Sequence, residues 1–361
     1  MLIGVDASRA VMPRAAGVGR YSRELIVPMA RASEHRFRLY VNGASAPAWA
    51  RLANLEWCDL PFPRLWTHVR LSWEMLRQPP EALFVPAHVA PLAHPQATVT
   101  TVHDLGYIRF SECHPAGQRL YLRLSTLWSV RTSAAVLADS QATKDDLVRL
   151  LRVPPARVSV AYPGVSNEFA PASKEAVLAV RRRYSLPDSY LLYVGTIQPR
   201  KNIARLLLAH SRTPEAPPLV MAGSPGWLSR DLIDTIDRSQ PRLRRLGFVP
   251  DDDLPAVMSG ALALLLPSLY EGFGMPVLEA MACGVPVLAS RTSSLPEIVG
   301  DAGLLVDPLS VEDIALGLRR LCTDGALLSF LREAGLERAK SFTWDACAAV
   351  ALKAIEAASA H

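Results

Sequence analysis

Two glutamates, Glu271 and Glu279, flank a glycine-rich stretch that could bind a polyol. The apolar run 261–266 before them predicts a buried strand, and Pro276 suits the first turn of a helix that Gly284 ends. Ligands of open α/β sheets bind beyond the carboxyl ends of the strands, where a helix N-terminus offers unpaired N–H groups. Two carboxylates there can accept hydrogen bonds from the hydroxyls of a sugar or a ribose. Taken alone, either glutamate could equally be an acid in the first turn of the helix that complements the helix dipole. The ligand site is favoured because two acids flank the sequence Gly-Phe-Gly-Met-Pro, which a helix dipole does not require.

Arg200 and Lys201 form a basic pair in a loop, 195–202, that follows a predicted strand at 190–194. Arginine binds a diphosphate through paired hydrogen bonds and lysine adds a point charge, so a loop at the end of a strand can neutralise a diphosphate with these residues. The alternative is a solvated basic turn. Under both interpretations we expect Arg200→Ala and Lys201→Ala to melt near the wild type, because the two cations should have no partner before a ligand arrives.

His103 and Asp104 close a predicted strand, 97–102, in the first half of the chain. A histidine there can donate a hydrogen bond to a sugar hydroxyl or to a departing oxygen, although a single histidine is more often structural. Gly17 and Gly19 predict a further ligand-binding loop after the first strand. They lack the third glycine of a dinucleotide fingerprint, which disfavours a dehydrogenase.

Apolar runs alternate with helical patterns through both halves of the chain, and this predicts parallel sheets in two doubly wound α/β domains. Residues 162–171, rich in Pro and Gly, form the predicted linker. Residues 44–81 are less regular, apart from a helix at 65–76 whose Trp66 and Trp73 we assign to the core or to an interface. The predicted strands are 2–6, 36–41, 82–86, 97–102, 134–138, 158–161, 190–194, 219–222, 243–249, 261–266, 287–289 and 304–306, and the clearest helices are 116–132, 141–151 (capped by Ser140), one after 249 (capped by Asp251 or Asp252) and 344–358.

The composition is globular, and the first half of the chain is basic. Of 361 residues, 50% are hydrophobic and 20% are charged. Residues 1–165 contain 19 Lys and Arg against 12 Asp and Glu, which favours an anionic membrane surface, an acidic acceptor or nucleic acid, unless it is only a solvated surface. The five cysteines are widely spaced and fit a reducing cytosol. The first residues do not read as a signal peptide, and no apolar run approaches the ~20 residues that span a bilayer.

The stretch from Glu271 to Glu279 resembles the Glu-x7-Glu signature of retaining glycosyltransferases of the GT-B fold, in particular family 4. The flanking residues 266–268, 280–287, 295–303 and 139–147 also resemble that family. The resemblance implies two Rossmann-like domains facing across a cleft. Residues 1–165 would form the acceptor domain, with the helix 344–361 packing back on it, and residues 172–343 would form the nucleotide-sugar domain.

The resemblance also implies roles for individual residues. Arg200 and Lys201 would hold the donor diphosphate, and Arg200 would replace an arginine that many members carry where this chain has Thr196. Glu279 would bind the ribose hydroxyls, while Glu271 and His103 would lie beside the donor sugar. The remaining donor-binding residues would be Gly17 and Gly19 near the diphosphate, and Gly195 at the start of the loop that carries Arg200 and Lys201. Phe248 and Val249 would lie in the turn at the nucleobase, and the loop and helix between the two glutamates would contribute Gly272, Phe273, Gly274, Met275, Pro276 and Val277.

The expected activity is therefore the retaining transfer of a hexose from a nucleotide-diphosphate sugar, without a metal or another cofactor. Likeness to mannosyl- and rhamnosyltransferases favours GDP-mannose or a related deoxyhexose donor and a glycan or lipid-linked acceptor in bacterial surface polysaccharide synthesis. The alternatives are a UDP-sugar-dependent transferase, a nucleotide-sugar epimerase of the same fold and, more remotely, a basic binding module without activity. We expect a cytoplasmic protein that does not bind nucleic acid and whose basic N-terminal domain contacts the inner membrane face peripherally.

Overall fold

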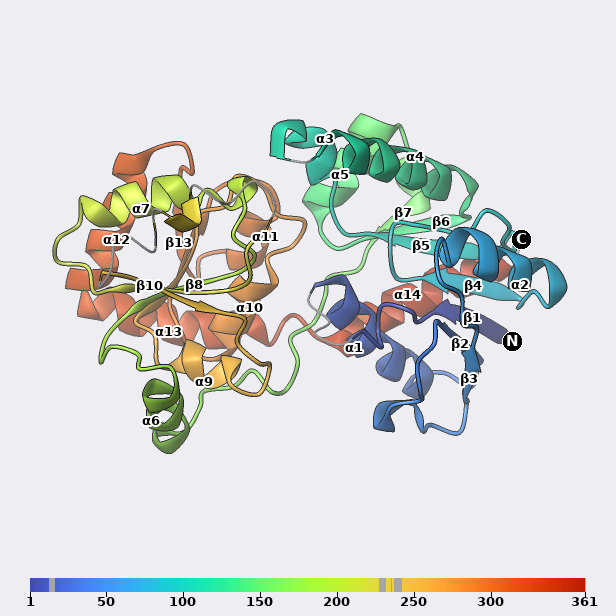
Figure 1. Cartoon of the computed structure of the whole chain (residues 1–361), viewed down its shortest axis with the longest axis horizontal. Coiled ribbons are helices and arrows are strands. Elements are labelled where there is room, and N and C mark those ends of the chain that lie inside the picture. The colour runs from blue at the N-terminus through green and yellow to red at the C-terminus, as the bar shows by residue number, and fades with distance from the viewer. Residues whose placement is uncertain (13–16, 114, 227–231, 235, 237–241, 361) are drawn as a thin grey trace. The chain divides into compact units, whose positions relative to one another are not determined.

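The computed structural model describes residues 1–12, 17–113, 115–226, 232–234, 236 and 242–360 (Figure 1). The chain divides into two compact units. Unit 1 contains Met1–Arg109, Pro115–Gly164 and Thr343–His361, and unit 2 contains Phe110–His114 and Val165–Phe342. Each unit holds one sheet of parallel strands, which confirms the prediction of two doubly wound α/β domains.

Unit 1 is built on a seven-stranded sheet with the order β3-β2-β1-β4-β5-β6-β7. Its strands are β1 (Leu2–Asp6), β2 (Arg36–Val41), β3 (Leu55–Asp59), β4 (Ala82–Val85), β5 (Thr98–Val102), β6 (Ala135–Ala138) and β7 (Val158–Val160). Its main helical segments are α1 (Val18–Arg31), the π-helical turn η2 (Thr67–Leu71), α2 (Ser72–Arg77), α3 (Gly106–Arg109), α4 (Ala116–Thr132), α5 (Gln141–Leu151) and α14 (Trp344–Ser359).

Unit 2 is built on a six-stranded sheet with the order β10-β9-β8-β11-β12-β13. Its strands are β8 (Leu191–Val194), β9 (Leu219–Ala222), β10 (Leu243–Gly247), β11 (Ala263–Leu266), β12 (Val287–Ser290) and β13 (Leu304–Val306). Its main helical segments are α6 (Lys174–Arg183), the 3₁₀ turn η5 (Pro199–Lys201), α7 (Ile203–Ser211), α9 (Leu254–Ser259), α10 (Met275–Ala282), α11 (Leu295–Val299), α12 (Val311–Thr323) and α13 (Gly325–Ala339).

The order of strands places a switch point in the middle of each sheet. In unit 2 the chain moves outward in one direction from β8 and in the other from β11, and these two strands pair directly. Ligands of doubly wound α/β sheets bind at such a switch point, beyond the carboxyl ends of the strands. The strands themselves are anchored by burial: every side chain of β11 is buried, as expected of a parallel strand covered on both faces.

The last helix, α14, belongs to unit 1 although it ends the chain. It packs against α1, where the rings of Trp344 and Tyr21 meet edge to face with their centroids 5.7 Å apart. Thr343 caps the helix by accepting a hydrogen bond from the N–H of Ala346 at 3.2 Å. The C-terminal segment thus completes the core of the unit that the N-terminus begins.

Three predictions about local structure need comment. The cap at Ser140 is confirmed, because its hydroxyl accepts a hydrogen bond from the N–H of Thr143 at 3.1 Å. The cap at Asp251 or Asp252 is wrong: Asp253 stands at that position, and its carboxylate instead contacts Arg183 at 2.7 Å. The predicted helix at 65–76 is a π-helical turn followed by α2, and β3 was not predicted at all.

Candidate active site

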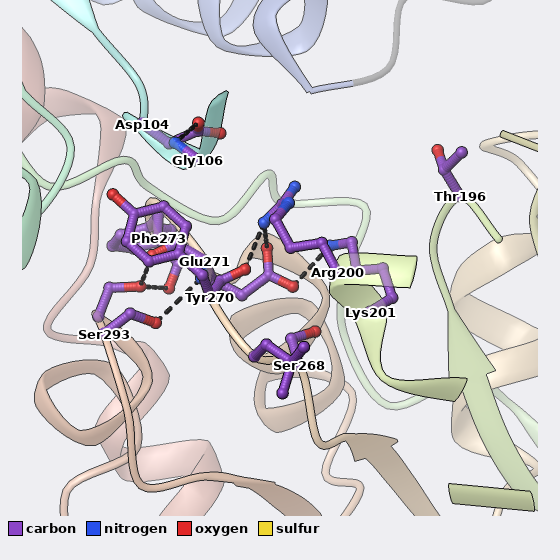
Figure 2. Close-up of polar contacts among 12 residues, drawn as sticks. Asp104, Gly106, Thr196, Arg200, Lys201, Ser268, Tyr270, Glu271, Phe273 and Ser293 are labelled. Carbon is purple, nitrogen blue, oxygen red and sulfur yellow. Dashed lines mark hydrogen bonds and ion pairs between the residues drawn. The ribbon is translucent and has the colours of Figure 1, made fainter. Parts of the chain in front are cut away.

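The loop that joins β11 to α10 is held in place by residues 293–295, which lead into α11. Gly274 has a φ of 109°, and a Cβ atom there would lie 2.6 Å from the Leu295 side chain, so only glycine fits without strain. The Ser294 hydroxyl donates to the carbonyls of Glu271 at 3.0 Å and of Phe273 at 2.8 Å. The Glu271 N–H donates to Ser293 Oγ at 2.9 Å (Figure 2). The loop before α10 is therefore fixed by contacts to the segment that leads into α11.

Arg200, Lys201 and Glu271 form a buried charge cluster in this loop region (Figure 2). Lys201 Nζ lies 2.6 Å from Glu271 Oε1, and Arg200 Nη1 lies 3.4 Å from Glu271 Oε2. Arg200 also donates to the carbonyl of Tyr270. The side chains of Lys201 and Glu271 are only 11% and 8% exposed. Arg200 and Lys201 together carry one more charge than Glu271, so these three residues form a positive cluster at the switch point of the unit 2 sheet, which suits an anionic ligand.

The expectation that these cations have no partner before a ligand arrives is wrong. Burial alone would raise the pKa of Glu271, but the charges of Lys201 and Arg200 outweigh it and lower that pKa below its usual 4.5. Glu271 is therefore ionised and committed to both cations. Since the pair is buried, removing one partner leaves an uncompensated charge. The structure therefore predicts that Lys201→Ala destabilises the fold, whereas the sequence had predicted a neutral substitution.

The loops after β8 and β11 are also joined by hydrogen bonds. Asn202 adopts a left-handed conformation with a φ of 59°, and its amide donates to the carbonyls of Pro267 at 2.9 Å and Pro308 at 2.6 Å. The Leu269 N–H donates to the Arg200 carbonyl at 2.9 Å. Asn202 thus positions the basic pair against the glutamate loop. No role had been predicted for Asn202, although it directly follows Lys201 in the sequence.

Glycines let the ends of β8, β9 and β10 approach one another closely. Gly195 and Gly223 have φ values of 149° and 147°, and a Cβ atom on Gly223 would lie 2.0 Å from the Gly195 carbonyl oxygen. The Gly223 N–H donates to the Gly247 carbonyl at 2.7 Å. Of these three, only Gly195 was among the predicted site residues. The strand-end loops of unit 2 therefore form one continuous backbone surface beside Arg200 and Lys201.

The other donor-binding residues predicted in unit 2 lie on the same edge of its sheet. Glu279 is the fifth residue of α10 and is 3% exposed, so it is neither a first-turn acid nor a surface residue. Met275, Pro276 and Val277 form the first turn of α10, and Gly272 lies in the loop before it. After β10, the ring of Phe248 is exposed while Val249 is buried.

His103 lies in unit 1 at the end of β5, and its partner is Asp139 and not Asp104. Its Nδ1 is 2.8 Å from Asp139 Oδ2 and its Nε2 is 3.2 Å from the Pro86 carbonyl oxygen. Both partners are acceptors, so only the doubly protonated ring satisfies both contacts. Burial opposes that charge, but Asp139 and the Pro86 carbonyl outweigh it and raise the pKa of His103. Asp104 instead accepts a hydrogen bond from the N–H of Gly106, the first residue of α3, at 2.8 Å (Figure 2).

The two glycines predicted near the diphosphate differ in structure. Gly17 precedes α1 with a φ of 54°, in open space, so a side chain is excluded by backbone conformation and not by contact. Gly19 is buried inside the first turn of α1, so the prediction of a loop there is wrong. Residues 13–16, between them and β1, lie outside the described part of the chain. Gly17, Gly19 and His103 are thus residues of unit 1, and the other predicted site residues belong to unit 2.

Asp139→Asn is expected to lower the pKa of His103, because it removes the carboxylate that stabilises the imidazolium. NMR titration of the His103 ring signals measures this. A raised pKa stabilises the fold below about pH 6.5, and this contribution is lost as the pH rises through the folded pKa, so the variant should lose that pH dependence. His68, whose pKa is lowered by burial, serves as the internal control and should titrate unchanged. An unaltered His103 titration in Asp139→Asn would show that the carboxylate does not set its charge.

Comparison with known proteins agrees with this geometry. Two family models match successive parts of the chain: Glycosyltransferase Family 4 matches residues 15–169 and Glycosyl transferases group 1 matches residues 181–338. The chain is 33% identical to "O-antigen chain mannosyltransferase B" of Escherichia coli over 364 residues, which cover 92% of this chain and 93% of that protein. The fold and the sequence matches together identify the chain as a glycosyltransferase. The chain belongs to the group 1 and family 4 glycosyltransferases of the GT-B fold.

Solved structures show the same fold at lower identity. Sucrose-phosphate synthase from Thermosynechococcus elongatus gives a TM-score of 0.78 at 21% identity, over 98% of this chain and 97% of that chain. WaaG, a glycosyltransferase involved in lipopolysaccharide biosynthesis, gives a TM-score of 0.75 at 18% identity, over 99% of each chain. Within the described residues, no helix is long and apolar enough to cross a membrane. The same part of the chain contains no group of three or more His, Cys, Asp or Glu arranged to hold a metal ion.

Proposed function

We propose that the protein transfers a mannosyl or related deoxyhexosyl residue from a GDP-linked sugar to a glycan or lipid-linked acceptor, retaining the anomeric configuration. The observation that supports sugar transfer best is the buried Arg200–Lys201–Glu271 cluster at the switch point of unit 2. GDP-mannose is favoured because the chain is 33% identical, along nearly its whole length, to a mannosyltransferase that builds an O-antigen chain. A surface polysaccharide is therefore the proposed product.

In this proposal, Arg200 and Lys201 stabilise the diphosphate as it leaves. Negative charge on the diphosphate grows while the glycosidic bond breaks, so cations fixed beforehand lower the energy of the transition state more than that of the bound donor. Asn202 and Glu271 hold the two cations in place and so limit the reorganisation that the reaction requires. The same cations do the work that a divalent metal does in other phosphate sites, so we propose that no metal takes part.

The two glutamates have different roles in the proposal. Glu271 is ionised and paired with Lys201 at 2.6 Å, so it orients that cation and does not attack the sugar. The acceptor then reacts on the face of the sugar from which the diphosphate departs, which accounts for retention. Glu279, buried in the second turn of α10, accepts hydrogen bonds from the ribose hydroxyls. We give His103 the role of a donor to a sugar hydroxyl, for which it would use the Nε2 atom that contacts the Pro86 carbonyl oxygen at 3.2 Å.

Donor binding tests this assignment by thermal shift with GDP-mannose, UDP-glucose and dTDP-rhamnose. A ligand at 100 times its Kd adds about 2.7 kcal/mol of stability, and we expect the largest shift with GDP-mannose.

Glu279→Gln should weaken donor binding by roughly 1.5–3 kcal/mol, because it loses the charged acceptor of two hydroxyls. Glu312→Gln is the control, since Glu312 is 76% exposed in an ion pair with Arg212. A larger thermal shift with a UDP-sugar than with GDP-mannose would show that the donor nucleotide is UDP and not GDP. Donor binding by Glu279→Gln at the wild-type affinity would show that Glu279 does not bind the ribose.

The product tests the reaction itself. NMR of the product formed from GDP-mannose should show the anomeric configuration of the donor, and EDTA should leave the rate nearly unchanged. Epimerised nucleotide-sugar without transfer would identify an epimerase instead. An inverted product would contradict retention, and a rate abolished by EDTA and restored by Mg²⁺ would contradict the metal-free mechanism.

A further inference from the structure

The core of unit 1 contains four buried polar atoms, close to His103, that lack a hydrogen-bond partner among the described residues. They are the Tyr21 hydroxyl, Thr101 Oγ1, Asp139 Oδ1 and the Trp344 indole N–H. Burying a polar group without a partner costs free energy, and the large majority of such groups in folded proteins bond to protein or to ordered water. Four of them near one residue of the candidate site therefore need an explanation.

The Tyr21 ring connects the residues that carry these atoms. Its centroid lies 4.8 Å from that of the His103 ring and 5.7 Å from that of the Trp344 ring, edge to face in both cases. Tyr21 comes from α1 and Trp344 from α14, and these two helices pack side by side in unit 1 (Figure 1). His103 follows β5, and its partner Asp139 follows the paired strand β6. Two helices from opposite ends of the chain thus meet the two strand ends that carry the His103–Asp139 pair.

The Tyr21 hydroxyl keeps its proton in this environment. Burial raises the pKa of Tyr21 well above its usual value, and the nearby Cys347 and Asp139 raise it further. Burial also raises the pKa of the Cys347 thiol, so that thiol is neutral. Thr101 Oγ1 and the thiol lie near the hydroxyl, but neither forms a hydrogen bond with it. Tyr21 is therefore a neutral donor close to a carboxylate oxygen, Asp139 Oδ1, that has no donor.

The hydrogen-bonding capacities of the four atoms match those of water. Tyr21 and Trp344 offer donors, Asp139 Oδ1 offers an acceptor, and the Thr101 hydroxyl can do either. A buried water molecule makes about three hydrogen bonds to groups of this kind. The Tyr21 hydroxyl and Asp139 Oδ1 do not bond to each other directly, so a molecule that both accepts and donates is needed to join them.

We propose that a buried water molecule joins the Tyr21 hydroxyl to Asp139 Oδ1, and that Tyr21 is thereby a positioning residue for His103. Asp139 Oδ2 lies 2.8 Å from His103 Nδ1. A carboxylate that is held at this oxygen alone can turn about its broad χ2 torsion and disturb the contact with the imidazole. With Oδ1 held as well, the ring keeps one orientation. The consequence for catalysis rests on the role proposed for His103 in sugar transfer, whereas the water bridge does not.

Tyr21→Phe tests the bridge, because it removes the hydroxyl and keeps the ring that packs on His103 and Trp344. In the full-length protein, the His103 Nδ1–H should give a separate downfield proton NMR signal, as expected of a charge-assisted hydrogen bond. In Tyr21→Phe this proton should exchange with solvent about fivefold faster, because the carboxylate has lost one hydrogen bond. Tyr40→Phe is the matched control: the Tyr40 hydroxyl is also buried without a partner, but it lies on β2, and the His103 signal should not change.

The rate of sugar transfer tests the positioning role. Tyr21→Phe should lower kcat/KM by about fivefold in the wild type and should cause no further loss in His103→Ala, because Tyr21 acts through His103. Tyr40→Phe should transfer sugar at the wild-type rate. An equal loss from Tyr21→Phe in both backgrounds would show that Tyr21 does not act through His103, and the positioning role would be wrong.

Two further outcomes separate the bridge from the proposed function. An unchanged His103 proton exchange rate in Tyr21→Phe would overturn the bridge, and so would a crystal structure without water between the Tyr21 hydroxyl and Asp139 Oδ1. If His103→Ala itself transfers sugar at the wild-type rate, the role proposed for His103 fails and Tyr21 has no catalytic consequence. The NMR comparison of Tyr21→Phe with Tyr40→Phe decides on the bridge in that case as well.

Discussion

Replacing Lys201 with methionine is expected to cost about 3 kcal/mol of stability and at least about a hundredfold in kcat/KM. The stability loss follows from burial. Glu271 would remain ionised and 8% exposed after losing the ammonium at 2.6 Å, and its remaining cation in the cluster would be the more distant Arg200 at 3.4 Å. The activity loss follows from the proposed role of Lys201, because one fixed donor to a developing oxyanion is worth about two orders of magnitude in rate.

The double variant Lys201→Met/Glu271→Gln separates these two effects. Removing both charges leaves no uncompensated ion, so most of the lost stability should return in urea unfolding, with a coupling energy of about 0.5–3 kcal/mol in the double-mutant cycle. Activity should not return, because the diphosphate still lacks its cation. If Lys201 and Glu271 were only a structural ion pair, the double variant would recover activity together with stability.

A second ion pair of similar length provides the matched control. Lys340 and Glu337 lie 2.7 Å apart, but their side chains are 72% and 76% exposed. Lys340→Met should therefore change stability by no more than about 0.5 kcal/mol, since exposed pairs are screened by water. The pH dependence should differ as well. The lowered pKa of Glu271 adds stability that is present above pH 4.5 and lost as the pH falls through the folded pKa, and the double variant should lack this dependence.

The sequence predicted the sheets well because a parallel strand is an apolar run. The β11 strand and the other five strands of unit 2 were all found, and helices 116–132 and 141–151 have the predicted bounds. The β3 strand was missed because it is an edge strand with half-buried side chains, so neither an apolar run nor strict alternation marks it. Gly274 could be predicted as part of a tight loop because its φ of 109° is a local property, whereas its close approach to Leu295 could not be predicted.

Contacts between residues that are far apart in the sequence could not be predicted. Lys201 and Glu271 are 70 residues apart and meet because β8 pairs directly with β11, an order of strands that the alternation of strands and helices does not reveal. His103 and Asp139 meet for the same reason, at the ends of the paired strands β5 and β6. The adjacent Asp104 was the more obvious partner in sequence, yet its carboxylate turns to the N–H of Gly106. Side-chain pairs across a sheet can be predicted only after the order of its strands is known.

Helix α4 shows the limit of periodicity, because Leu120 and Leu124 are exposed while its buried residues include Ser125 and Ser129. Its leucines recur at helical spacing, and the pattern predicts a helix at 116–132 with the bounds observed. The same pattern would place Leu120 and Leu124 in the core, because a periodic stripe does not say what it packs against. Only the positions of Ser125 and Ser129 under the helix show that the stripe faces outward.

Gly223→Ala is expected to destabilise unit 2 by about 3 kcal/mol or more and to weaken donor binding. The added Cβ atom would lie 2.0 Å from the Gly195 carbonyl oxygen and 2.7 Å from its carbonyl carbon. These are backbone atoms, so no side-chain rotation relieves the overlap. The φ of 147° adds strain of its own. Either the end of β9 or the loop after β8 must move.

Movement of the loop after β8 is what links this glycine to function. That loop leads from Gly195 to Arg200 and Lys201, and its backbone is tied to the next loop by the hydrogen bond from the Gly226 N–H to the Ile197 carbonyl at 2.8 Å. Gly43→Ala is the control: its φ of 66° is also left-handed, but a Cβ atom there meets nothing within 4 Å, so only the conformational cost of about 1 kcal/mol remains. Urea unfolding gives the difference between the two variants, and thermal shift with GDP-mannose gives donor binding. Equal unfolding curves for Gly223→Ala and Gly43→Ala would show that the strand ends are not packed as tightly as the Gly195–Gly223 contact requires.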